Sequence, residues 1–159
     1  MKKIILGIDP GYDRVGWAIG SGEKGKFNCV ALGCIQTDKT ADIFDRYKRI
    51  QSDLKEIIEY FKPSELAIET LFFSKNKKTA LRVSEARGVI IAACLDAGLA
   101  VFEYDPVTIK VAVTGNGKAD KESVEKMVKL QVNGVVNKFI DDAIDAVAIA
   151  MTHGVSVNI

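Results

Sequence analysis

An apolar run near the amino terminus ends abruptly in an acid and a turn. Residues Ile4 to Ile8 are almost all aliphatic, which predicts a strand buried on both faces. Asp9 comes where the run stops. Pro10 and Gly11 then break the strand, because proline lacks a backbone N–H and glycine readily adopts positive φ. Asp9 is therefore expected at the end of a core strand, where an unpaired carboxylate is costly to bury.

The rest of the chain alternates between the periods of strands and helices. Strands are predicted over 14–21, 27–37, 65–70 and 99–104, with Val15, Trp17 and Ile19 alternating in the first of these. Helices are predicted over 40–61 with Asp42 as N-cap, over 79–96, from Pro106, after an N-cap at Asp120, and over 141–153. This pattern predicts an α/β fold with a five-stranded mixed sheet and helices on its faces.

Length and composition limit the class of protein. The chain has 159 residues, 48% hydrophobic and 27% charged, so we expect one domain over residues 1–159 with a substantial core. A net charge of +1 neither favours nor opposes a polyanionic partner. Three cysteines without metal-ligand spacing are typical of reduced thiols in the cytoplasm. The apolar run that ends at Asp9 is too short for a signal peptide, and no membrane span is expected.

Two acids are predicted to meet at one edge of the sheet. Asp9 ends the first strand, and Glu69 ends the short apolar run Leu66 to Ile68. The helix between these strands implies a right-handed crossover to a parallel strand. Because ligands of open α/β sheets gather at the carboxyl ends of the strands, Asp9 and Glu69 are candidate site residues.

The last helix carries three further acids, Asp141, Asp142 and Asp145. Residues three and four apart share a helix face, so Asp145 pairs with either Asp141 or Asp142, and spacing alone does not choose. Acids in a first helical turn also stabilise the helix dipole, which is the simpler interpretation of Asp141. The helix beyond them is too apolar for a solvated surface, which favours a buried role for the acids.

Four clustered carboxylates would repel one another and raise one another's pKa values unless cations lay between them. Oxygen ligands of this kind suit Mg²⁺ or Mn²⁺ and not zinc. A pair of such ions serves phosphodiester hydrolysis, in which one activates the attacking water and the other stabilises the leaving oxygen. The sequence therefore suggests a metal-dependent nuclease.

Two basic clusters predict a nucleic-acid surface beside these acids. The first contains Lys75, Lys77, Lys78, Arg82 and Arg87 against one acid, Glu85. The second, with Lys110, Lys118 and Lys121, flanks a glycine loop at 115–117 that could bring backbone N–H groups close to phosphate. Phe72 precedes the first cluster and Asn76 lies inside it, so an aromatic ring could stack on unpaired bases. Solvated lysines are the alternative interpretation.

Several short blocks together resemble the RuvC family of bacterial Holliday-junction resolvases. They run in the family's order and cover nearly the whole chain. The blocks are Gly7 to Gly11, Ala67-Ile68-Glu69, Phe72, Lys75-Asn76, Ala86 to Val89, Val101 to Tyr104, Gly115-x-Gly117-x-Ala119-x-Lys121, Asp142 to Ala146, Ala148 to Ala150 and Thr152-His153.

The resemblance implies a ribonuclease H-like fold and a Mg²⁺-dependent endodeoxyribonuclease that resolves four-way DNA junctions in recombination and repair. Paired symmetric nicks would come from a homodimer. The catalytic metal ligands implied for two Mg²⁺ ions, with Mn²⁺ as an alternative, are Asp9, Glu69, Asp142 and Asp145. Among the acids of the last helix, the resemblance thus selects Asp142 over Asp141.

The same resemblance also implies a set of contacts with DNA and protein partners. Phe72 would lie near the junction centre, Lys110 and Lys121 beside the scissile phosphate, and Arg87 and Gly88 in the dimer interface. The branch-migration proteins RuvA and RuvB are implied as partners. The sequence ends at Ile159 without the basic tail of longer family members, and we expect the chemistry not to depend on such a tail.

Three alternatives stay open at the level of sequence. A related nuclease could use the same acids on RNA–DNA hybrids or RNA. An ATPase of the actin–hexokinase type also opens with a strand, an acid and a glycine, but it normally needs two such domains. A non-catalytic junction-binding module would have no use for an acidic pocket.

Overall fold

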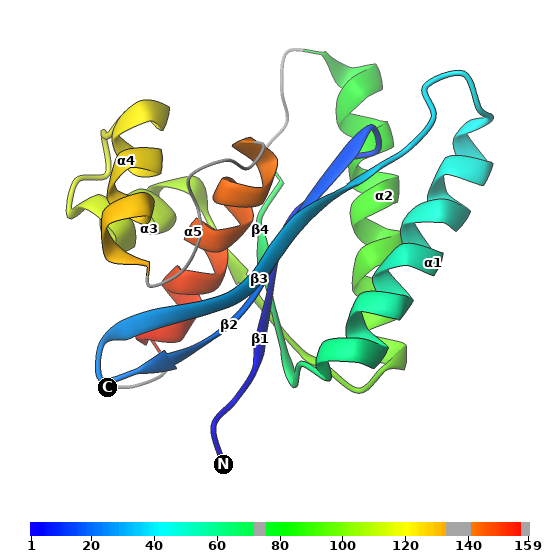
Figure 1. The fold of residues 1–159 in the computed structure, drawn as a ribbon. Helices are drawn as coiled ribbons and strands as arrows, with labels where there is room; N and C mark the ends of the chain where they lie inside the picture. Colours follow the sequence, from blue (N-terminus) through cyan, green and yellow to red (C-terminus); the bar gives the residue numbers. More distant parts are fainter. Residues whose placement is uncertain (72–75, 133–140, 157–159) are drawn as a thin grey trace.

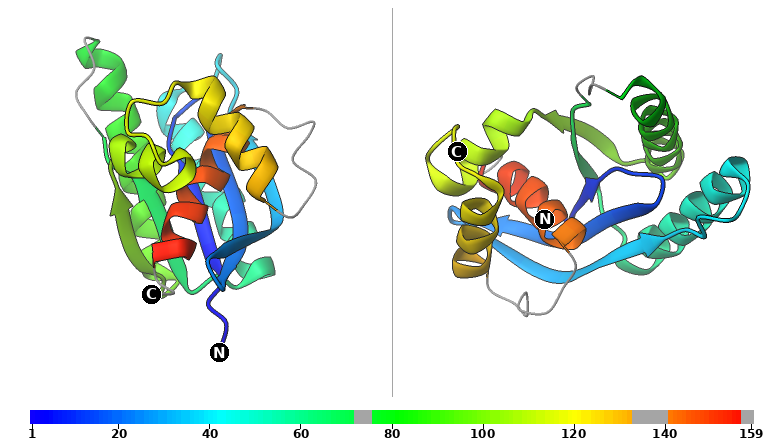
Figure 2. Two further views of the ribbon diagram at one scale, coloured as in Figure 1. Left: turned by 90° about the vertical axis from the view of Figure 1, so that its left-hand side faces the viewer. Right: turned by 90° about the horizontal axis from the view of Figure 1, so that it is seen from above.

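The computed structural model describes residues 1–71, 76–132 and 141–156, which form a five-stranded sheet between two layers of helices (Figures 1 and 2). The strand order is β3-β2-β1-β4-β5. The two pairings among β1, β4 and β5 are parallel, and β2 and β3 are antiparallel to their neighbours. The predicted mixed sheet is therefore confirmed. The strands are β1 (Ile5–Asp9), β2 (Arg14–Glu23), β3 (Lys26–Gln36), β4 (Glu65–Glu69) and β5 (Ala100–Tyr104).

The helices divide between the two faces of the sheet. Helices α1 (Ile43–Phe61) and α2 (Lys77–Asp96) cover one face, and α5 (Asp141–Ser156) covers the other with α3 (Pro106–Thr114) and α4 (Lys121–Gln131) outside it (Figure 1). Each face has its own apolar core. Within the described residues, no helix is long and apolar enough to cross a bilayer.

Helix boundaries follow side chains that satisfy the first free N–H groups. Asp42 accepts from Phe44 N and Asp120 accepts from Ser123 N, so both predicted N-caps are confirmed. Helix α2 begins at Lys77, two residues before the predicted start, because the Asn76 side chain caps it by accepting from Thr79 N.

Strand β2 differs from the prediction in its length and its faces. It runs on to Glu23, and the hairpin turns at Lys24 and Gly25, both with positive φ. Val15 and Ile19 are buried on the α1 side, but the intervening Ala18 is also buried, in the core beneath α5. Val15, Ile19 and the partly buried Trp17 thus share one face as predicted, but helices cover both faces of this strand, so its other face is also buried.

The two-residue period of the parallel strands decides which side chains face α5. In β1, Ile5 lies in the core under α5, whereas Leu6 and Ile8 lie in the core under α1 and α2. Asp9 is four residues after Ile5 and so lies on the α5 face. In β4, Ala67 faces α5, and Glu69 follows two residues later on the same face.

Candidate active site

Asp9 and Glu69 lie side by side at the carboxyl ends of neighbouring parallel strands. Ile8 pairs with Ile68 in the register of β1 and β4, and each acid is the next residue along its strand. Both side chains are half-buried. The predicted convergence of these two acids at one sheet edge is therefore found in the structure.

Helix α5 approaches the sheet so closely that only glycine fits at two positions beneath it. A Cβ on Gly16 would lie 1.9 Å from the backbone oxygen of Asp142, and a Cβ on Gly7 would lie 2.4 Å from that of Ala146. These contacts bring the first turn of α5 down onto the strand end that carries Asp9. The acids of α5 thus reach the same sheet edge.

The two candidate acids of α5 differ from their exposed neighbour Asp141. Asp142 and Asp145 are half-buried and lie three residues apart on one face, whereas Asp141 is exposed. Arg14 Nε lies 3.2 Å from Asp142 Oδ2, and Lys121 Nζ lies 3.5 Å from Asp145 Oδ2. Each acid thus has a basic neighbour from another element.

Electrostatic coupling shows that the acids share one environment. The pKa of Asp9 is raised to about 8, first by burial and then by the charges of Asp145, Glu69 and Asp142, while Lys121 opposes the shift. Burial and the charge of Asp145 also raise the pKa of Glu69. Burial raises the pKa of Asp145, and Lys121 counteracts it. A cluster of this kind needs positive charge before all its members can ionise.

The donor chemistry of these acids fits divalent cations that prefer oxygen. All four are carboxylates, and Asp142 Oδ2 is buried yet accepts no hydrogen bond, because Arg14 approaches it in a poor geometry for one. Within the described residues, no three His, Cys, Asp or Glu side chains are gathered tightly enough to hold one ion among them. Binding would therefore require small side-chain movements that draw the acids together.

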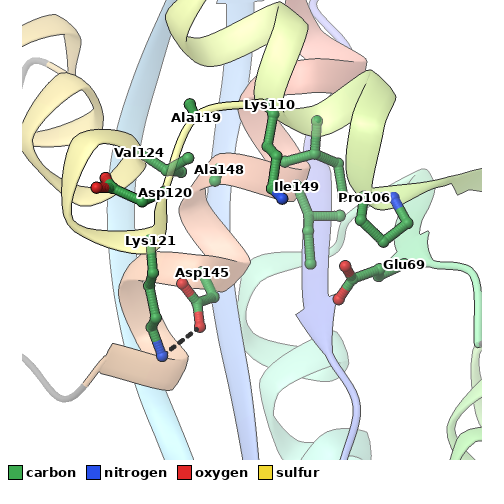
Figure 3. Close-up of a pocket in the computed structure, with 11 residues that line it drawn as sticks. Glu69, Pro106, Lys110, Ala119, Asp120, Lys121, Val124, Asp145, Ala148 and Ile149 are labelled. Atoms are coloured by element: carbon green, nitrogen blue, oxygen red, sulfur yellow. Dashed lines mark ion pairs between the residues drawn. The ribbon is translucent and has the colours of Figure 1, made fainter. Parts of the chain in front are cut away.

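A cavity of about 260 Å³ opens beside these acids, between α3, α4 and α5. Its lining includes Glu69 and Asp145 together with Lys110 and Lys121 (Figure 3). Figure 3 also shows the ion pair between Lys121 and Asp145. The cavity is thus lined by two acids and two lysines, an arrangement suited to a phosphate bound next to a cation.

The other residues predicted to bind DNA occupy varied environments. Phe72 and Lys75 lie outside the described residues. Lys77, Lys78 and Lys118 are exposed. Asn76 caps α2, and Arg82 forms an ion pair with Glu85 at 3.1 Å.

Arg87 and Gly88, predicted at a dimer interface, lie in different environments on α2. Arg87 Nε donates to the backbone oxygen of Glu69 at 3.1 Å, and its other end pairs with the Glu103 carboxylate. This side chain is only 15% exposed and supports the end of β4. Gly88 is exposed, and a Cβ there would meet nothing within 4 Å.

Sequence reasoning missed two further basic residues, Arg14 beside Asp142 and Arg46 against the turn that follows Asp9. Arg14 is the first residue of β2 and contacts Asp142. Arg46 is a buried residue of α1 that contacts the turn after Asp9. Arg14 follows closely after the turn that begins at Pro10, and this position could have marked it as a neighbour of Asp9. Nothing in the helical pattern distinguishes Arg46 from its neighbours.

A sheet of this topology, with acids at the ends of β1 and β4 and on α5, defines the chain as a nuclease of the ribonuclease H-like fold. Comparison with known proteins agrees. The family model "Crossover junction endodeoxyribonuclease RuvC" matches residues 5–153. The chain therefore belongs to the RuvC family of crossover junction endodeoxyribonucleases, which are phosphodiester hydrolases, and membership implies use of a divalent metal.

Individual relatives are similar over nearly their whole length. The RuvC of Finegoldia magna is 44% identical over 151 residues, covering 94% of this chain and 91% of that protein. The RuvC of Pseudothermotoga lettingae is also 44% identical, covering 94% and 93%. The structure of Thermus thermophilus RuvC in complex with Holliday junction substrate superposes with a TM-score of 0.90 at 29% identity, covering 98% of this chain and 94% of that one.

Proposed function

We propose that this chain resolves four-way DNA junctions by metal-dependent hydrolysis at the site formed by Asp9, Glu69, Asp142 and Asp145. The observation that carries the proposal is the convergence of the four acids at one sheet edge, where burial and then the charges of the other three raise the pKa of Asp9 to about 8. Such repulsion is costly for a protein that only binds DNA, but it suits one that recruits cations before it acts. The junction is proposed as substrate because the chain belongs to the RuvC family and resembles the complex of T. thermophilus RuvC.

The four carboxylates would hold two Mg²⁺ ions, with Mn²⁺ as an alternative. When bound, such ions supply an activated water and charge stabilisation for the leaving oxygen. The chain's own contribution is to orient the carboxylates through rigid strand ends and the first turn of α5. Burial of Asp9 also limits access of bulk water and strengthens its attraction for a cation.

The lysines beside the cavity would position the DNA backbone. Lys110 and Lys121 line the cavity together with Glu69 and Asp145 and would contact the phosphate next to the cleaved bond. Lys118, Lys77, Lys78 and Arg82, with Asn76, would follow the strands further out. Phe72 stays a prediction for the junction centre, and Lys75 stays a prediction for DNA binding. Phosphate contacts of this kind position the duplex without reading its sequence.

A homodimer would present two such sites to the two opposing strands of a junction. Helix α2 supports this, because Gly88 is exposed with open space around it and Leu81 on the same helix is an exposed apolar side chain. Arg87 would contribute less directly, since its guanidinium is already bound to Glu69 and Glu103. RuvA and RuvB are proposed as partners on the basis of family resemblance alone.

A cleavage panel tests the function. The wild-type chain with Mg²⁺ should nick a four-way junction at two symmetric positions and leave linear duplex and RNA–DNA hybrid uncut. Asp9→Asn should lose cleavage and still bind the junction. A preference for hybrid would favour a nuclease acting on RNA–DNA hybrids, and junction binding without any metal-dependent cleavage would favour a non-catalytic module.

A further inference from the structure

Helix α1 carries a buried arginine on the side of the molecule away from α5. Arg46 is 8% exposed, although it is flanked by the exposed residues Asp45 and, two positions on, Lys48. A buried guanidinium is stable only where its N–H groups find acceptors. Those acceptors lie in the turn of residues 10–13, which joins β1 to β2, and at Thr37, just after β3.

The contacts of Arg46 are concentrated on this turn. Its Nε donates to Thr37 Oγ1 at 3.0 Å, and its NH2 group donates to the backbone oxygen of Tyr12 at 3.2 Å. The same group forms an ion pair with the Asp13 carboxylate. The guanidinium also lies 5.2 Å from the centre of the Tyr12 ring, a cation–π distance.

Thr37 completes the attachment from β3. Its hydroxyl donates to the backbone oxygen of Tyr12 at 2.6 Å, and its backbone N–H donates to the oxygen of Asp13 at 3.0 Å. The turn is therefore held by α1 and β3 at once. The bonds donated by Arg46 are charge-assisted, and such hydrogen bonds are among the stronger ones in proteins.

The two ends of this turn are both part of the acidic site. Asp9 immediately precedes it, and Arg14 immediately follows it with its Nε 3.2 Å from Asp142 Oδ2. The turn is tight, since a Cβ on Gly11 would lie 2.3 Å from the backbone oxygen of Arg14. A displacement of Tyr12 or Asp13 would therefore shift both the Asp9 carboxylate and the basic partner of Asp142.

We propose that Arg46 is a positioning residue of the metal site, acting through the 10–13 turn on Asp9 and on Arg14. The proposal rests on the proposed function, because it requires Asp9 and Asp142 to bind the cations. Groups that hydrogen-bond a metal ligand directly typically change metal affinity by about 10–100-fold when removed. Arg46 acts one step further out, through the turn, so we expect Arg46→Met to weaken binding by about 10-fold, the lower end of that range.

The test measures metal binding by the full chain without DNA. Free Mn²⁺ is followed by electron paramagnetic resonance during titration of wild type, Arg46→Met and the control Arg49→Met. Arg49 lies on the same helix but is exposed and pairs with Asp53. We expect weaker Mn²⁺ binding in Arg46→Met alone, together with recovery of junction cleavage at high Mn²⁺. A merely structural role would lower the thermal stability and leave the Mn²⁺ affinity of the folded protein unchanged.

A milder variant keeps the proposal testable if Arg46→Met does not fold. Thr37→Val removes the hydroxyl that links Arg46 to Tyr12 and should weaken Mn²⁺ binding in the same direction by about 3–10-fold. Wild-type Mn²⁺ affinity in a folded variant of either kind overturns the role of Arg46. If wild type binds no Mn²⁺, or binds it no better than Asp9→Asn, the proposed function itself fails.

Discussion

Replacing Asp9 by asparagine should stabilise the metal-free protein while abolishing its chemistry. The pKa of Asp9 is about 8 in the fold and near 3.8 in an unfolded chain, because burial and three neighbouring acids disfavour its charge. Between these values the folded protein retains a proton that the unfolded protein releases. The stability of the metal-free wild type therefore falls as pH rises from about 4 to about 8.

The size of the effect follows from the two pKa values. pH 7 is about 3 pH units above the pKa of Asp9 in the unfolded chain and still below its value of about 8 in the fold. At about 1.4 kcal/mol per unit, Asp9 therefore lowers the free energy of unfolding of the wild type by about 4 kcal/mol at pH 7. Asparagine has nearly the same shape and no charge. Asp9→Asn should therefore raise the free energy of unfolding by about 4 kcal/mol at pH 7 and change it little at pH 4.

Urea unfolding in the presence of EDTA from pH 4 to pH 8 measures this difference directly. Asp141→Asn is the matched control, since Asp141 is an exposed acid at the start of α5 and should show no such pH dependence. Saturating Mg²⁺ should stabilise wild type more than Asp9→Asn. Unfolding free energies of wild type and Asp9→Asn that stay parallel across this pH range would refute the electrostatic reasoning.

Two other substitutions test the geometry and the charge of the site. Gly16→Ala places a methyl group where the Asp142 oxygen lies at 1.9 Å, so the unfolding free energy should fall by about 1–3 kcal/mol and cleavage by about 100-fold. Gly88→Ala is the control: its methyl group meets nothing, so it should not lose stability when both variants are measured by calorimetry. Full cleavage by Gly16→Ala would contradict the close approach of α5 to the sheet. Lys121 lowers the pKa values of Asp9 and Asp145, so Lys121→Met should move the pH–rate profile of cleavage toward higher pH. An unmoved profile would show that Lys121 is not coupled to these acids.

Most secondary structure could be predicted because its signals are local. The run before Asp9 is a strand whose end coincides with the acid, and Asp42, Pro106 and Asp120 stand where the helices begin. The start of α2 was misplaced because Asn76 was interpreted as a DNA contact, although it also serves as a cap. In β2 the predicted alternation of Val15, Trp17 and Ile19 on one face is confirmed, but the burial of the other face was not predicted, since its small residues Gly16 and Ala18 give only a weak apolar signal and pack beneath α5.

The acids of the site were predictable as candidates, but their environment was not. Spacing left Asp141 and Asp142 equivalent, and the structure separates them by burial and by the contact with Arg14. Charge alone placed Arg87 in the basic cluster around α2, and the family resemblance assigned it to a dimer interface. Its hydrogen bond to Glu69 depends on how α2 packs beside β4, which no local pattern reports.

The acids repel one another, so it is the packing of the backbone that holds them together. Glycines at positions 7 and 16 allow α5 to contact the strands directly, and the packing of α5 in its apolar core opposes the repulsion that raises the pKa of Asp9. Arg14 and Lys121 contact Asp142 and Asp145 and partly neutralise them before a metal arrives. Both contacts are weak: Arg14 approaches Asp142 in a poor geometry for a hydrogen bond, and Lys121 lies 3.5 Å from Asp145. A divalent cation can therefore replace them at modest cost. A site that is assembled by packing and only loosely neutralised by its own side chains is therefore suited to bind metal without refolding.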